Sequence, residues 1–123
     1  MERFPCPCCG YLVFSGPPGT DEICPICGWE DDVSQLRFLR MAGGANKPSL
    51  VDAQKNFMEA GASDIALIGR LRAPAPFEHK DPEWRPIGAA ENICDETRET
   101  GPAYPLDRTE LYYWRDSDWR RKK

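Results

Sequence analysis

Two copies of one short cysteine motif constrain this chain more than any other feature of its sequence. The motif C-P-x-C-G occupies Cys6–Gly10 and again Cys24–Gly28. Within each copy, proline presets the turn and the final glycine supplies a left-handed backbone position, so that both thiolates can reach one metal ion. Two such turns predict a closed tetrahedral site, which is structural rather than catalytic. Its ligands are expected to be Cys6, Cys9, Cys24 and Cys27.

The ion that we expect at this site is one structural Zn²⁺. Zinc takes four thiolates in tetrahedral geometry and has no redox chemistry of its own. Paired C-x-x-C-G turns also hold a single iron ion in rubredoxin-like electron carriers, so iron remains the alternative. Between the two motifs, Tyr11–Phe14 reads as a strand and Ser15–Gly19 as a turn, which together predict a hairpin leading into the second motif.

Composition bounds the size and the compartment of the chain. Its 123 residues suit one domain, and 12 prolines with 10 glycines favour short elements joined by ordered loops. The N-terminus has no apolar region typical of a signal peptide, and no apolar run approaches the roughly 20 residues that span a bilayer. We therefore expect a cytoplasmic protein without membrane association. Thiols stay reduced in that compartment, so the six cysteines predict metal ligands rather than disulfides.

The order of patterns along the chain predicts an α+β fold in a single domain covering 1–123. We expect a zinc-ribbon-like knuckle hairpin at 1–32 and a helical segment at 33–72. The remainder, 73–123, is expected to hold a proline-rich segment and a C-terminal aromatic element.

A first helix is expected from Val33 to about Arg40. Asp32 is placed to cap its N-terminus, and Gln35 occupies the position from which a side chain can bond back to the capping residue. Farther along, residues 65–71 are apolar enough for a strand or a short helix, and the pattern leaves both open.

A second helix is more clearly marked by its ends. Ser49 is a good N-cap, Asp52 lies in the first turn, and Gly61 suits the left-handed position that follows a helix. The apolar residues that fall on one face of this helix are Leu50, Ala53, Phe57 and Ala60.

The C-terminal half has less regular patterning. Trp84 and Ile87 are expected to anchor the extended residues 73–105 on the core. Residues 106–119 fit either a helix or a strand, and the basic residues 120–123 read as a frayed end. The residues that would cap such a helix are Asp107 and Glu110.

Catalysis is not expected from this sequence. Cys8 fills the variable slot of the first motif, so we expect a small buried hydrophobe that points away from the metal. A reactive thiol, or exchange with Cys6 or Cys9 as ligand, remains the alternative. Cys94 has acidic neighbours, which raise a thiol pKa and argue against a nucleophile. His79, the single histidine, lies in a charged stretch, and no nucleotide-binding or hydrolase motif is present.

The acidity of the chain favours a basic partner. The formal net charge is −4, and four ligand thiolates with one divalent ion would bring it to −6. Such a molecule repels phosphate backbones, so nucleic acid is disfavoured. In the acidic cluster at 29–32, we expect Trp29 to pack over the metal site and Asp32 to cap a helix. Glu30 and Asp31 are then left for a second cation or a partner.

Three stretches of the chain, Phe4–Tyr11, Ile23–Asp32 and Gly43–Asn46, together resemble the bacterial cysteine-rich CPCC family. The resemblance continues at Ser49, Leu50, Ala53, Asn56 and Gly61. The resemblance covers residues 4–61 and extends more weakly to Pro86. It implies metal binding. Small proteins of this kind also look like those found near bacterial polymorphic toxins, which implies an immunity protein, or antitoxin, that neutralises a cognate basic toxin domain. The first candidates for partner contact are Trp29, Glu30, Asp31, Glu91, Asp95, Glu96 and Glu99.

Two other functions compete with this one. A zinc ribbon can bind nucleic acid, and here only Arg37, Arg40, Lys47 and the basic residues 120–123 could contribute. A redox or metal-responsive switch would instead use Cys8, and labelling of that thiol in the metal-loaded protein would reveal it.

Overall fold

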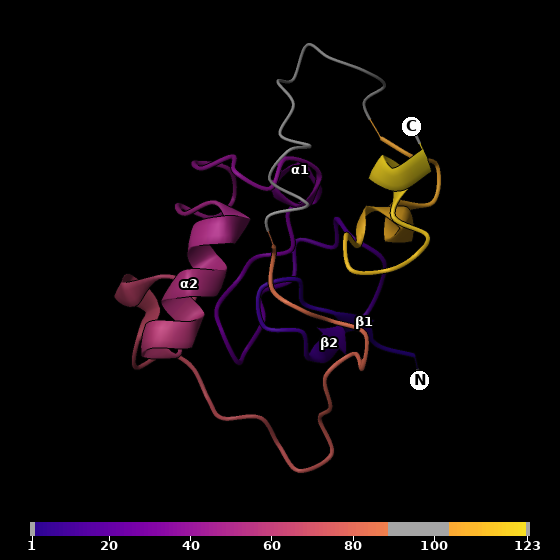
Figure 1. Cartoon of the computed structure of the whole chain (residues 1–123). Helices are drawn as coiled ribbons and strands as arrows, with labels where there is room; N and C mark the ends of the chain where they lie inside the picture. The colour runs from indigo at the N-terminus through magenta and orange to yellow at the C-terminus, as the bar shows by residue number, and fades with distance from the viewer. Residues whose placement is uncertain (1, 89–103, 123) are drawn as a thin grey trace.

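The cysteine motifs lie at the centre of the molecule, each at the tip of its own small hairpin (Figure 1). The computed structural model describes residues 2–88 and 104–122. β1 (Phe4–Pro5) and β2 (Leu12–Phe14) pair antiparallel around the first motif, with Phe4 opposite Phe14. The second motif is closed by a single antiparallel bridge between Ile23 and Glu30.

This pairing corrects the expected hairpin. We expected the strand at residues 11–14 to lead through a turn back to the second motif, whereas β2 pairs with β1 on its N-terminal side. The reason lies in Pro17 and Pro18, which have no backbone N–H to offer a ladder. The segment after β2 contacts the segment before the second motif through side chains instead. Ser15 donates its backbone N–H and its hydroxyl to the carboxylate of Glu22.

α1 (Val33–Arg37) is shorter than expected. It begins as expected at Asp32, whose carboxylate accepts from the backbone N–H groups of Ser34 and Gln35. It ends at Phe38, whose backbone is extended, rather than near Arg40. The expected capping role of Gln35 is wrong. Its side-chain amide is fully buried and turns toward the following loop instead of the residue that caps the helix.

α2 (Leu50–Ala60) has both expected ends. The Ser49 hydroxyl accepts from the N–H of Asp52, and Gly61 adopts the left-handed conformation with φ of 76°. Leu50 and Ala53 are fully buried, as the pattern predicts. The helix turns away from the core toward its C-terminus, so that Phe57 is half-buried and Ala60 is exposed.

The rest of the described chain is built from short 3₁₀ turns rather than strands or α-helices. η1 (Ile65–Leu67) settles the open choice for residues 65–71 in favour of a short helix. Of the helix or strand expected at 106–119, the structure has only the short η2 (Arg108–Leu111), and η3 (Trp119–Lys122) begins at the last residue of that range. Asp107 caps η2 as expected, by accepting from the N–H of Thr109. In the described residues, neither α-helix is both long and apolar enough to cross a bilayer.

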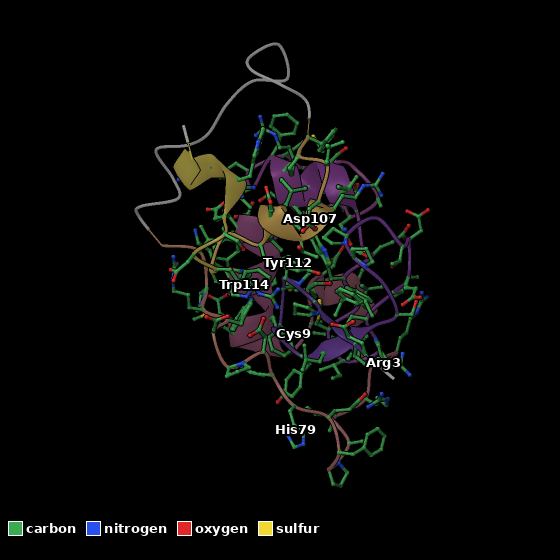
Figure 2. The ribbon with its side chains drawn as sticks, turned by 90° about the vertical axis from the view of Figure 1, so that its right-hand side faces the viewer. Arg3, Cys9, His79, Asp107, Tyr112 and Trp114 are labelled. Atoms are coloured by element: carbon green, nitrogen blue, oxygen red, sulfur yellow. The ribbon has the colours of Figure 1, made fainter. Side chains whose placement is uncertain are left out.

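The C-terminal segment completes the core around the cysteine motifs. Trp84 and Ile87 pack against this core, as expected, and Ile87 also donates its N–H to the side chain of Gln54. Tyr112 and Trp114 are both buried and stack at 4.9 Å between ring centroids, and Figure 2 shows them above Cys9. The largest fully buried side chains are Trp29, Tyr112, Tyr113, Leu36, Leu50 and Leu111.

The basic residues 120–123 were expected to be a frayed end, and this expectation is wrong for Arg120. Arg120 is buried, and its guanidinium donates to the carboxylate of Asp118 and to the carbonyl oxygens of Leu36 and Leu111. A buried arginine persists only where its donors find acceptors, and here the end of α1 supplies them. Arg120 therefore ties the C-terminal segment to the N-terminal half of the chain.

Candidate metal centre

Four sulfur atoms converge at the predicted site. The Sγ atoms of Cys6, Cys9, Cys24 and Cys27 all lie within 4.8 Å of one another. Cys6 and Cys27 are 3.6 Å apart, and Cys9 and Cys24 are 3.7 Å apart, measured between sulfurs. A tetrahedron with metal–sulfur bonds of about 2.3 Å has edges of about 3.8 Å. A disulfide would need about 2.05 Å. The geometry therefore fits one metal ion held by four thiolates.

The electrostatics of the cluster call for a cation. All four ligand residues are fully buried. Burial raises the pKa of the Cys6 and Cys27 thiols well above the ordinary value. The pKa of Cys24 is instead lowered, because Cys27, Cys6 and Cys9 form hydrogen bonds with its sulfur. Without a cation, burial therefore opposes the charged form of Cys6 and Cys27. A divalent ion would supply the charge that lets all four ionise.

The two motifs repeat the same backbone bonds. In the first, Gly10 N–H donates to the carbonyl of Cys6 at 2.7 Å, and Cys6 N–H donates to the carbonyl of Tyr11 at 2.9 Å. In the second, Gly28 donates to Cys24, and Cys24 donates to Trp29, both at 2.8 Å. The glycines have matching φ values of 85° and 88°. The sequence repeat is therefore a structural repeat, and the left-handed glycine predicted for each motif is confirmed.

Each motif is covered by a later segment of the chain, which the sequence did not reveal. Trp84 lies over the first motif, where its indole N–H donates to the carbonyl of Pro7, and a Cβ at Gly10 would lie 2.6 Å from its ring. Leu67 lies over the second motif, where a Cβ at Gly28 would lie 2.6 Å from its Cδ1. Both glycines are needed for the close approach of these side chains as well as for the turn.

Replacing Gly10 with alanine should cost more stability than replacing Gly43, and this difference isolates the contact with Trp84. Both glycines have positive φ, but a Cβ at Gly43 would meet no atom within 4 Å. The left-handed backbone alone costs alanine about 1–2 kcal/mol. Overpacking adds about 1–3 kcal/mol at Gly10 only. Urea unfolding of both variants in their metal-loaded forms measures the difference. Equal losses would show that Trp84 does not press on the motif.

The acidic cluster after the second motif is held by a loop. Asn46 accepts from the N–H of Glu30 and donates to its carbonyl, both at 2.8 Å, and it also donates to the buried side chain of Gln35. The second carboxylate oxygen of Asp32 accepts from the N–H of Ala45. A Cβ at Gly44 would lie 2.6 Å from that oxygen, so glycine is required there. The loop thus fixes the backbone of the cluster.

Two residues of this cluster are buried and do not face solvent. Trp29 is fully buried in the core, as expected for a side chain packed beside the motif, and Asp31 is 2% exposed. The Asp31 carboxylate accepts from the N–H groups of Gly19 and Thr20 and from the Thr20 hydroxyl. Burial raises the pKa of Asp31, although these hydrogen bonds lower it. In this conformation a partner could touch Glu30, which is partly exposed, but not Trp29 or Asp31.

Asp31 should tolerate asparagine better than alanine. Its folded pKa lies above the unfolded value, so its charge lowers stability at neutral pH, and protonation relieves that loss as the pH falls through the folded pKa. Asparagine removes the charge and keeps an acceptor oxygen, so we expect a change within about 1 kcal/mol. Alanine leaves the buried donors of Gly19 and Thr20 without an acceptor and should cost about 1–3 kcal/mol. Urea unfolding at pH 7 compares the two, and equal costs would contradict this role.

The other candidates separate clearly by position. Cys8 is 1% exposed and outside the converging group of four, which agrees with a small buried hydrophobe, and burial raises the pKa of its thiol. His79 is exposed and projects from the edge of the molecule in Figure 2, so it forms no pair with Cys8. The residues that lie outside the described part of the chain are Glu91, Cys94, Asp95, Glu96 and Glu99.

Fold and site together define a small α+β protein built around a buried cluster of four cysteines that could bind a metal ion. The family model for cysteine-rich CPCC proteins matches residues 4–78, which is more than half of the chain. The chain belongs to this family. The match includes both motifs, both α-helices and η1, and it stops before Trp84 and the C-terminal segment that complete the core. Comparison with curated proteins gave no match.

Proposed function

We propose that the ion is Zn²⁺ and that it serves as a structural centre for a protein-binding module. The observation that carries this proposal is the set of four fully buried cysteines with tetrahedral sulfur spacing. A four-thiolate site that is closed to solvent leaves no position for water or substrate, so it stabilises a fold rather than performing a reaction. Iron would occupy the same geometry, and its red colour and visible absorption distinguish it from zinc.

The module's partner is proposed to be a basic protein, and the sharpest version is a bacterial toxin domain that this chain neutralises in the cytoplasm. The charge supports this version, since −4 becomes −6 with thiolates and one divalent ion. Glu30 offers a carboxylate on a backbone that Asn46 holds rigid. The remaining candidate contacts are the carboxylates Glu91, Asp95, Glu96 and Glu99.

The two competing functions receive less support from the described residues. Arg37 and Arg120 are buried and therefore not exposed for binding nucleic acid. The Arg37 guanidinium lies over the rings of Phe38 and Trp119, at 4.5 and 4.6 Å from their centroids. A switch based on Cys8 would need an accessible thiol, and this one is 1% exposed.

Coexpression tests the immunity function directly. The toxin to use is the product of the gene beside this one, expressed with and without the metal-loaded chain in a sensitive host. We expect survival only with the chain, and a complex of the two purified proteins whose affinity falls as salt rises. Glu30→Lys should weaken the complex, whereas the exposed Glu59→Lys on α2 serves as a charge-matched control. A neighbour without toxicity, or toxicity that the chain does not relieve, would contradict the proposal.

A further inference from the structure

Residues 63–72 form an arch over the second cysteine motif. One foot is fixed by Ser63, whose N–H donates to the carbonyl of Cys27 at 2.7 Å. The other is fixed by Arg72, whose N–H donates to the carbonyl of Pro25 at 3.1 Å. Between the feet, Leu67 rests on Gly28. The arch is therefore tied to the metal centre at three points and presents its outer side as a firm surface.

The outer side of the arch is apolar and exposed. Ile65 is 67% exposed and Ile68 is 54% exposed, and Ile23 beside the second motif is 62% exposed. The first motif differs, because the indole of Trp84 covers it. Isolated exposed apolar side chains are ordinary. Ile65 and Ile68, however, lie three residues apart across η1, and residues with this spacing in a 3₁₀ turn lie on the same side of it.

A groove of about 440 Å³ runs between the arch and the loop that holds the acidic cluster. Its apolar lining includes Ile23, Leu67 and Leu71. A second hollow of about 310 Å³ lies between the arch and the C-terminal end of α2, where Ile68 and Leu71 contribute to its wall. The arch is thus a ridge that borders two hollows. Such a surface can mate with its own copy, because the ridge of one molecule can enter the hollow of the other.

The charges around the larger groove are balanced. Its lining carries two acidic residues, Glu30 and Asp64, and two basic residues, Lys47 and Arg70. Within residues 2–88 and 104–122, no ion pair uses any of the four. A neutral patch on a chain of net charge −4 is a place where two copies can meet without repulsion. Each copy offers both the cations and the carboxylates that the other needs, as an isologous interface requires.

We propose that this chain forms a symmetric homodimer through the ridge and the groove beside the second cysteine motif. The apolar residues Ile65 and Ile68 form the centre of the interface, and the four charges form its rim. The dimer and the proposed toxin complex both use Glu30, so they would compete for this face. The tests below use this chain alone, so a failure of the dimer is distinguishable from a failure of toxin neutralisation.

Sedimentation of the metal-loaded full chain over a wide concentration range tests the dimer. We expect a species of twice 13.9 kDa. Ile68→Asp places a charge at the centre of the interface and should weaken association by at least about tenfold. Leu106→Asp is the matched control, since Leu106 is fully exposed and lines neither hollow, and it should leave the dimer intact. A wild-type chain that stays monomeric throughout would overturn the proposal.

A charge exchange then distinguishes this interface from any other. Arg70→Glu changes the rim from neutral to net negative, and Glu30→Lys changes it to net positive, so each variant alone should dissociate. Mixing the two should restore a dimer that contains one copy of each, which native mass spectrometry can identify. Two variants that remain dimeric on their own, or that fail to combine, would contradict the ridge-and-groove interface. Circular dichroism of each variant confirms that the fold is retained.

Discussion

Replacing Cys27 with serine will remove the metal ion and, with it, most of the cooperative fold. Metal binding in such sites is worth about 10–16 kcal/mol, which matches or exceeds the total stability of about 5–15 kcal/mol that a domain has. The second motif would lose its ligand, and the arch that rests on this motif would lose its support. Metal content by mass spectrometry and thermal unfolding by circular dichroism should therefore change together.

Cys8→Ser is the matched control for this experiment. Cys8 is as deeply buried as the ligands but lies outside the four converging sulfurs, so this variant should keep its ion and lose only about 1–3 kcal/mol for a buried hydroxyl. The double variant C8S/C27S should behave like C27S alone. A C27S protein that keeps both ion and cooperative melting would contradict the assignment of Cys27. If C27S keeps its ion but C8S/C27S loses it, Cys8 has replaced residue 27 as a ligand in the single variant.

Replacing Arg120 with alanine should destabilise the fold by about 3–5 kcal/mol while leaving the metal ion in place. The guanidinium is buried against Asp118, at 3.0 Å between nitrogen and oxygen, and removing it takes away the cation that neutralises this buried carboxylate. The carbonyl oxygens of Leu36 and Leu111 also lose their donors. The loss should appear as a lower urea midpoint with the ion still bound.

The exposed Arg40→Ala is the control for Arg120, and it should change stability by less than about 0.5 kcal/mol. A small effect at Arg120 would mean that the C-terminal segment does not belong to the cooperative unit. A large loss of metal would mean that the segment is needed for the site itself.

The elements that could be predicted from the sequence are those that depend on local chemistry. The C-P-x-C-G spacing gives the converging sulfurs, because each pair is set by one turn of five residues. Asp32, Ser49 and Gly61 mark helix ends, because a cap is decided by the nearest few backbone groups. The family resemblance rested on the same local residues, and the match over residues 4–78 confirms it.

What could not be predicted depends on contacts between distant residues. Gln35 suited a capping box by its spacing, yet its amide bonds the carbonyls of Met41, Asn46 and Pro48, because the loop that it meets is set by tertiary structure. Arg120 looked like part of a solvated basic end, and only the carbonyl groups at the end of α1 make its burial possible. Asp31 looked like a surface carboxylate, because the donors that make its burial possible come from residues 19 and 20, which lie far from it in the sequence.

One ion held by four sulfurs is the claim on which the fold, the arch and the proposed interface all depend. Native mass spectrometry of the purified chain, before and after acidification, measures it directly. We expect the native mass to exceed the acid mass by one divalent ion less the protons that it displaces, with an isotope pattern that identifies zinc. Equal masses, or an acid mass lowered by the hydrogens lost to disulfides, would contradict this account.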